Sequence, residues 1–106
     1  MKILLDESVP VQVKSALAGH VVSTVSELGW KGRENGELLT AVEQAGFEVF
    51  ILADKNLRYQ QNLSARRIAL VELWTNHRPT LEKHFALIAS AVTGIRAGEY
   101  RIVSKP

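Results

Sequence analysis

Four short, continuous apolar runs constrain the fold of this chain more than any other feature of its sequence. Each has the length of a β-strand and is rich in leucine or β-branched residues, which predicts strands at 2–6, 20–25, 48–54 and 67–73. A further edge strand is predicted at 99–104, after an Ala-Gly turn. Strands that are apolar throughout, rather than at every second position, are typical of parallel sheets covered on both faces.

Helical patterns separate these strands, and the first of them follows the strand at 2–6. Ser8 can cap this helix, which carries Pro10 in its first turn. Val13 and Leu17 would then face inward, and Gly19 would end the helix.

Two further helices have recognisable ends. One begins at a cap by Asn35 and ends at Gly46, and the other opens at Thr80, after Pro79, and ends before Gly94. Their inward-facing residues recur at helical spacing: Leu38, Leu39 and Val42 in the former, and Leu81, Phe85, Ile88 and Val92 in the latter. The polar segment 56–66 is predicted to be a short helix or an ordered loop.

Strands and helices therefore alternate along the chain. This alternation predicts an α/β fold, a compact three-layer α/β/α domain around a mostly parallel sheet of four to five strands. The 106 residues suffice for one such domain, spanning 1–106. The absence of cysteine excludes disulfides, zinc ribbons and thiol nucleophiles. No apolar run approaches the ~20 residues of a membrane span, so we expect a soluble, cytoplasmic protein.

The sequence contains only two aspartates, and each ends a predicted strand: Asp6 the first and Asp54 the third. If right-handed crossovers make these strands neighbours, their carboxyl ends flank the position where open α/β sheets bind ligands. Two carboxylates ~5 Å apart repel by roughly 3 kcal/mol at an effective dielectric of 20, so a shared cation is favoured. Oxygen ligands favour Mg²⁺ or Mn²⁺. The alternative is that each aspartate caps the helix that follows it.

Two glutamates are candidates to complete such a metal site. Glu7 follows Asp6, but successive side chains of a strand diverge, so Glu7 is equally well explained as a solvated acid. Glu37 lies in the first turn of the second predicted helix. There it is either a metal ligand or an acid that interacts favourably with the helix dipole.

Other side chains offer weaker signals. The spacing of His20, His77 and His84 fits no metal site, and "GWKGRENG" lacks the Gly-Lys-Ser/Thr of a phosphate-binding loop. Trp30 and Trp74 are interpreted either as stacking platforms for bases or as residues at the edge of the core. The net charge of +2 does not by itself identify a nucleic-acid binder.

Three stretches taken together, "ILLDES-P", "ELGWKGRENGELL" and "ILADKNLRYQQNL", resemble the short, toxin-like members of the PIN-like nuclease superfamily. The resemblance covers nearly the whole chain and implies a compact parallel α/β sheet. It further implies metal-dependent hydrolysis of RNA, with Asp6, Asp54 and Glu37 as catalytic metal ligands. It also implies a small antitoxin protein as a partner; homodimer formation is left open.

The sequence departs from the PIN-like pattern at two positions. Asn35-Gly36-Glu37 stands where related short domains often carry three acids, so the acid of this motif must be Glu37. Asn56 stands where relatives often carry aspartate, and it can ligate a metal only through its carbonyl oxygen. A weakened or inactive nuclease that acts by binding is therefore an alternative.

The polar run that begins at Asp54 supplies candidate substrate contacts. Lys55 or Arg58 can neutralise phosphate charge. In this hypothesis the run forms an RNA-facing rim. The candidate substrate-binding residues are Lys55, Arg58 and Tyr59 of the run, together with Asn35.

A phospho-acceptor (receiver) domain is the alternative from another functional class. Receivers share the expected architecture and also place acids after the first and third strands. Asp6 and Glu7 would then hold Mg²⁺ and Asp54 would be phosphorylated, with Lys105 before Pro106 matching a late Lys-Pro pair. Against this alternative, no hydroxyl residue stands at the end of a strand in the interval that a receiver requires, and Thr75 is the nearest.

Overall fold

The computed structural model describes residues 1–33, 35–53 and 66–106. The predicted metal ligands Asp54 and Asn56 lie outside the described residues, as does nearly all of the segment 56–66 that was expected to be a short helix or loop. The predicted substrate contacts Lys55, Arg58 and Tyr59 lie outside them too.

The described chain contains one five-stranded sheet in which every pair of neighbouring strands is parallel. The strand order is β2-β1-β3-β4-β5, so β1 and β3 are neighbours, as predicted. Each strand falls within a predicted apolar run: β1 (Lys2–Leu5), β2 (Val21–Thr24), β3 (Val49–Leu52), β4 (Ala69–Leu73) and β5 (Tyr100–Val103).

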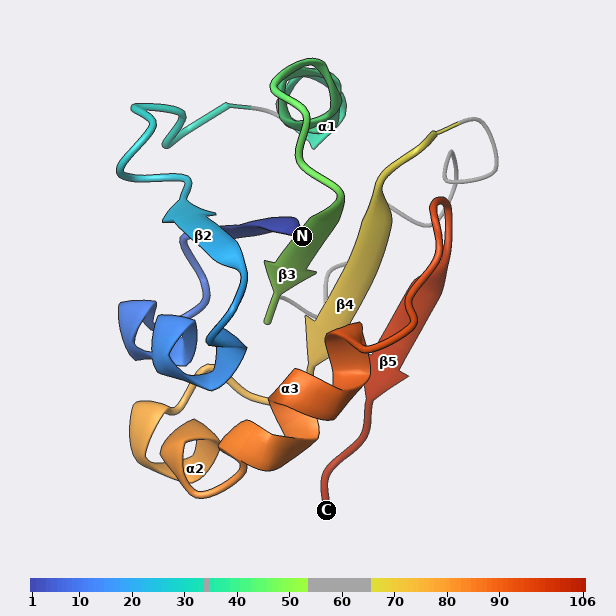
Figure 1. Ribbon diagram of the computed structural model, residues 1–106. Helices are drawn as coiled ribbons and strands as arrows, with labels where there is room; N and C mark the ends of the chain where they lie inside the picture. Colours follow the sequence, from blue (N-terminus) through green and yellow to red (C-terminus); the bar gives the residue numbers. More distant parts are fainter. Residues whose placement is uncertain (34, 54–65) are drawn as a thin grey trace.

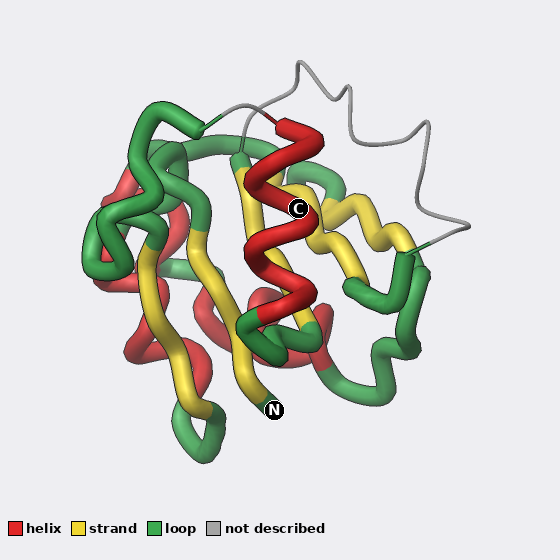
Figure 2. The backbone as a smooth tube through the Cα atoms, turned by 90° about the horizontal axis from the view of Figure 1, so that it is seen from above, coloured by secondary structure: helices red, strands yellow, loops and turns green. Residues whose placement is uncertain are grey.

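Helices cover both faces of the sheet and give the predicted three layers (Figure 1). On one face lies α1 (Asn35–Gln44), which lies in front of the sheet in Figure 2 and runs roughly along the direction of its strands. On the other lie the 3₁₀ helix η1 (Val11–Leu17), α2 (Arg78–Glu82) and α3 (Phe85–Val92). None of the helices in the described chain is both long enough and apolar enough to cross a membrane.

The core is divided by the sheet into two halves because successive strand side chains point to opposite faces. Within β3, Val49 and Ile51 pack with the η1, α2 and α3 side, whereas Phe50 and Leu52 pack with the α1 side. All four side chains are buried. This arrangement explains why the strand sequences are apolar without alternation.

The helix α1 ends where the sequence predicted. Its residues Leu38, Leu39 and Val42 are buried against the sheet. Gly46 follows with φ of +84°, a left-handed conformation that glycine adopts without a steric penalty. The amide of Phe47 then donates to the carbonyl of Val42 at 3.2 Å, which closes the helix.

The first predicted helix differs from expectation in type and in its cap. It is a 3₁₀ helix preceded by Pro10, and no side chain caps its amino end. The prediction that Ser8 caps this helix is wrong, because the hydroxyl of Ser8 bonds to the end of the sheet instead. Val13 and Leu17 are buried, as predicted.

The third predicted helix is divided in two. It begins at Arg78 rather than Thr80, and α2 and α3 are separated at Lys83 and His84. The amide of His84 donates to the carbonyl of Leu81, a 3₁₀-type bond that tightens the turn. The φ of −127° at His84 then takes the chain out of helical geometry. Leu81, Ile88 and Val92 remain buried, whereas Phe85 is only partly so.

Candidate functional site

The residues expected to act together lie at the edge of the sheet where its parallel strands end, called here the carboxyl edge. Asp6 follows β1 directly, and its amide donates to the carbonyl of Ile51 in β3 at 2.8 Å. The pairing of β1 with β3 therefore extends to Asp6. In the order β2-β1-β3-β4-β5 the strand order reverses between β1 and β3, which is where doubly wound sheets bind ligands.

The half-buried carboxylate of Asp6 is held by Ser8. The Ser8 hydroxyl donates to Oδ2 of Asp6 at 2.6 Å, and the Ser8 amide lies 3.3 Å from the same oxygen. The amide of Ala53, just after β3, donates to the Ser8 hydroxyl oxygen at 3.1 Å. One side chain therefore connects the Asp6 carboxylate to the carboxyl end of the neighbouring strand.

The hydrogen bonds from Ser8 define the structural role of the Asp6 carboxylate in this loop. A carboxylate that accepts from the amide two residues ahead forms an Asx turn, a common way for aspartate to order a loop. The amino end of η1 has no side-chain cap, so the alternative in which Asp6 caps the following helix is wrong. The Oδ1 atom of Asp6 accepts no hydrogen bond from the described part of the chain and keeps its coordination capacity.

The two candidate glutamates are both exposed. Glu7 follows Asp6 in the loop, and Glu37 lies in the first turn of α1. Among the described residues, no three acidic or histidine side chains gather closely enough to hold a metal ion. Asp6, Glu7 and Glu37 therefore do not form a complete site by themselves. Asn35 is the first residue of α1, and its side chain is outside the description.

In the described part of the chain, the histidines and tryptophans contact neighbouring side chains or the amino terminus. The ring of Trp30 packs edge-on against Phe47 with centroids 6.3 Å apart, and that of Trp74 packs against His84 at 5.6 Å. Each tryptophan lies against one half of the core, at its edge. His20 lies 3.0 Å from the Met1 nitrogen, and His77 lies 2.8 Å from the Thr80 hydroxyl.

Ser8 is the residue at this site that sequence reasoning assigned to a different task. A signal for its role is present, because serine two residues after aspartate is the spacing of an Asx turn. What no local pattern reveals is the bond from Ala53, which is 45 positions away in the sequence.

The fold and the site define a class: a parallel α/β domain with a fixed carboxylate at the switch point of its sheet. Comparisons of the chain with protein-family models, with curated proteins and with solved structures give no match.

Proposed function

We propose that this chain is a metal-dependent ribonuclease whose site is the carboxyl edge between β1 and β3. The observation that carries the proposal is the Asp6 carboxylate, which Ser8 holds at the switch point while Oδ1 stays without a partner in the described chain. A fixed oxygen donor with spare capacity at that position is suited to a hard divalent cation. Such an ion would supply charge stabilisation at a scissile phosphate.

The remaining ligands in this proposal come from the sequence. Asp54 follows Ala53, whose amide already bonds to the residue that holds Asp6. Asp54 is proposed as the second carboxylate ligand and Glu37 as the third. Glu7 and Asn56 are additional candidates.

The chain's own groups would orient the substrate. Ser8 keeps the Asp6 carboxylate in one orientation, which keeps its free oxygen in a constant position. Lys55 and Arg58 are proposed to offset phosphate charge, and Asn35 and Tyr59 to contact RNA. By resemblance to toxin-like nucleases, the partner protein would be a small antitoxin.

A phospho-acceptor domain is the second candidate, and the strand order favours it. The order β2-β1-β3-β4-β5 is that of the flavodoxin-like doubly wound fold, in which ligands bind between β1 and β3. In this alternative Asp54 accepts a phosphoryl group. Incorporation of phosphate from a small phosphodonor, lost in Asp54→Asn, would support the phospho-acceptor and contradict the nuclease.

The nuclease proposal is tested by cleavage of a mixed single-stranded RNA pool with Mn²⁺. Wild type should cleave, whereas Asp6→Asn and Asp54→Asn should not. Glu48→Gln is the matched control, because Glu48 is an exposed acid just before β3, at the opposite edge of the sheet. Equal cleavage by wild type, Asp6→Asn and Asp54→Asn would show a contaminating activity, and equal cleavage by wild type and Asp6→Asn alone would remove the support for Asp6.

Metal binding has its own readout, independent of cleavage. An ion that binds only the folded state raises the melting temperature, so Mn²⁺ should raise that of wild type and of Glu48→Gln, but not that of Asp6→Asn. A metal-induced rise without cleavage would favour a catalytically degenerate binding module. No rise in any variant would contradict the metal site.

A further inference from the structure

A pocket lies at the opposite edge of the sheet, where the strands begin, called here the amino edge. Its volume is about 330 Å³. Ile95 and Ala97 contribute accessible apolar lining, next to the buried Phe47 and Val49, and Arg67 and Arg96 contribute charge. Ligand sites in proteins are typically concave and combine apolar surface with a few placed polar groups. This pocket is more polar than most, because four of its ten lining residues are charged.

The two pocket arginines differ from the other arginines of the described chain. Those others use their guanidinium groups within the protein: Arg66 on Glu43, Arg101 on Glu99, Arg78 on Glu82, and Arg33 over the ring of Trp30. The side chains of Arg67 and Arg96 donate no hydrogen bond to any described residue, and both residues are exposed. Their donors are therefore available to a ligand.

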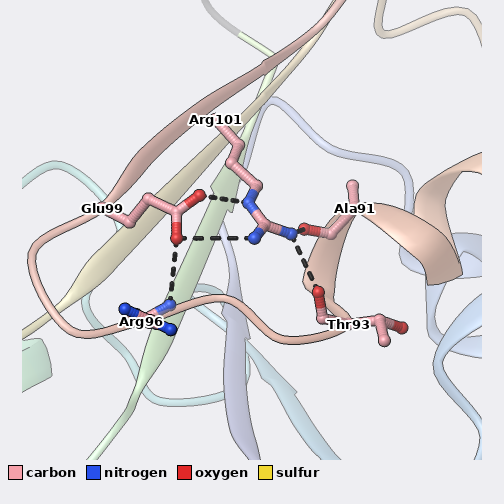
Figure 3. Close-up of polar contacts among 5 residues, drawn as sticks. All are labelled: Ala91, Thr93, Arg96, Glu99 and Arg101. Atoms are coloured by element: carbon pink, nitrogen blue, oxygen red, sulfur yellow. Dashed lines mark hydrogen bonds and ion pairs between the residues drawn. The ribbon is translucent and has the colours of Figure 1, made fainter.

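The loop that carries Arg96 is fixed by the contacts drawn in Figure 3. The side chain of Arg101 donates to the carbonyls of Ala91 at 3.0 Å and Thr93 at 2.9 Å, and it also pairs with Glu99. Glu99 in turn accepts from the backbone amide of Arg96 at 3.2 Å. Glu99 therefore fixes the backbone of Arg96 at the pocket, and Arg101 connects Glu99 to the end of α3 through the carbonyls of Ala91 and Thr93.

Arg67 is held in a closely similar way. Glu43 pairs with the side chain of Arg66 at 2.7 Å and accepts from the backbone amide of Arg67 at 3.1 Å. In both places one glutamate forms an ion pair with the side chain of one arginine and accepts a hydrogen bond from the backbone amide of another. The second arginine is thereby positioned while its side chain remains free of hydrogen bonds within the described chain.

The charge balance of the pocket favours an anion. The hydrogen bond from Arg101 lowers the pKa of Glu99. Burial alone would raise the pKa of Glu43, but the hydrogen bonds from Arg66 and Arg67 bring it below its usual value. Both acids are ionised and form their side-chain ion pairs with Arg66 and Arg101, while the charges of Arg67 and Arg96 act on them without a side-chain hydrogen bond. Glu48 is the remaining acid of the lining, against two guanidinium groups.

We propose that this pocket binds a small organic anion, with its carboxylate or phosphate on Arg67 and Arg96 and its apolar part against Ile95 and Ala97, the apolar lining residues with exposed surface. Guanidinium groups bind both anions through paired charge-assisted hydrogen bonds. The site is independent of the proposed ribonuclease, because it lies at the other edge of the sheet.

The test is a titration of the ¹⁵N-labelled protein, followed by amide chemical shifts, with benzoate, phenyl phosphate, inorganic phosphate and the uncharged benzamide. We expect benzoate or phenyl phosphate to produce saturable shifts at Phe47–Val49 and Arg96–Ala97. The tighter of these two identifies the head group, and inorganic phosphate and benzamide should bind more weakly. Arg67→Gln and Arg96→Gln should each weaken binding by about tenfold.

The matched control is Arg78→Gln, which removes an exposed arginine that pairs with Glu82 on α2. It should leave the affinity unchanged. An unchanged spectrum away from the pocket verifies that each variant is folded. The proposal is overturned if neither organic anion shifts the pocket amides, if benzamide binds equally well, or if the Arg67 and Arg96 variants bind like wild type.

Discussion

The hydroxyl of Ser8 donates a 2.6 Å hydrogen bond to the Asp6 carboxylate. That length is typical of a bond strengthened by the negative charge of its acceptor. Because the same hydroxyl oxygen accepts from the backbone after β3, the orientation of Asp6 depends on the relative position of two strands. A change in Ser8 should therefore affect both the stability of the sheet edge and the geometry of the candidate site.

Ser8→Ala should lower the free energy of unfolding by about 1–3 kcal/mol, because it leaves the partly buried amide of Ala53 without its partner. Urea unfolding followed by circular dichroism measures this loss. Ser15→Ala is the control, since Ser15 is exposed on η1 and should change stability by less than about 0.5 kcal/mol. Equal stability of the two variants would contradict the bridging role of Ser8.

The same substitution, isoleucine to valine, at a buried and at an exposed position measures how much the loss of stability depends on burial. Ile51 is 0% exposed in β3, whereas Ile102 is 57% exposed in β5. Ile51→Val should cost about 0.5–1.5 kcal/mol through the lost methylene and the cavity left behind. Ile102→Val should cost less than about 0.5 kcal/mol. Denaturant midpoints compare them directly, and a larger loss at Ile102 would contradict the described packing of β5.

Two glycines of the α1 region should respond to alanine with opposite signs. Gly46→Ala places a side chain at φ of +84°, which should destabilise the protein by about 1 kcal/mol, although beyond the adjacent residues the nearest atom to the new Cβ is the Lys2 Nζ at 4.0 Å. Gly36→Ala adds a methyl group in open space within α1 and should stabilise it by about 0.5–1 kcal/mol. Thermal unfolding measures both, and a stabilising Gly46→Ala would refute the assigned turn.

The contribution of Glu43 should depend on pH. Its pKa is lowered in the folded protein from an ordinary value of 4.5, so its ionised form is favoured by folding. That stabilisation is complete above about pH 4.5 and is lost as the pH falls through the lower, folded-state pKa. Glu43→Gln should therefore cost about 1–2 kcal/mol near pH 7 and progressively less near pH 3.5.

Glu82→Gln is the control for this pH dependence. Glu82 pairs with Arg78 at 3.3 Å, but both side chains are about half exposed, so the pair should contribute less than about 1 kcal/mol. Unfolding free energies of the three proteins across this pH range measure the difference. A loss in Glu43→Gln that is constant with pH would contradict the assigned ionisation.

The three central strands β1, β3 and β4 can be predicted from the sequence because burial on both faces leaves an apolar signal at nearly every position of the strand. Phe50, for example, belongs to a strand with no polar side chain, and it packs beneath α1 while its neighbours pack against the other layer. The adjacency of β1 and β3 follows from right-handed crossovers together with the placement of η1 and α1 on opposite faces of the sheet. The positions of the strands, their parallel direction and the layers of the fold all follow from these two general rules, the burial pattern of strands and the handedness of their connections.

The details of the site depend instead on competition between possible partners. Ser8 is a good helix cap by type, yet a carboxylate and a strand amide lie within its reach and take its hydroxyl. The division of the third helix likewise depends on the φ of His84, which no spacing of apolar residues reveals. The carboxylate partnership of Asp6 with Asp54 stays a prediction, since Asp54 lies outside the described residues.

The central place of β1 also has a consequence for how the chain acquires its structure. Ile3 pairs with Val49, 46 positions further along, and no strand pair in the sheet is a local hairpin. To form such a distant pair the chain must first close a long loop, which costs conformational entropy before any contact between the strands stabilises it. This slows folding. During synthesis β1 emerges first, but its apolar edge has no second neighbour until β3 has followed. That interval is when a nascent chain of this kind is most exposed to aggregation and gains most from a chaperone.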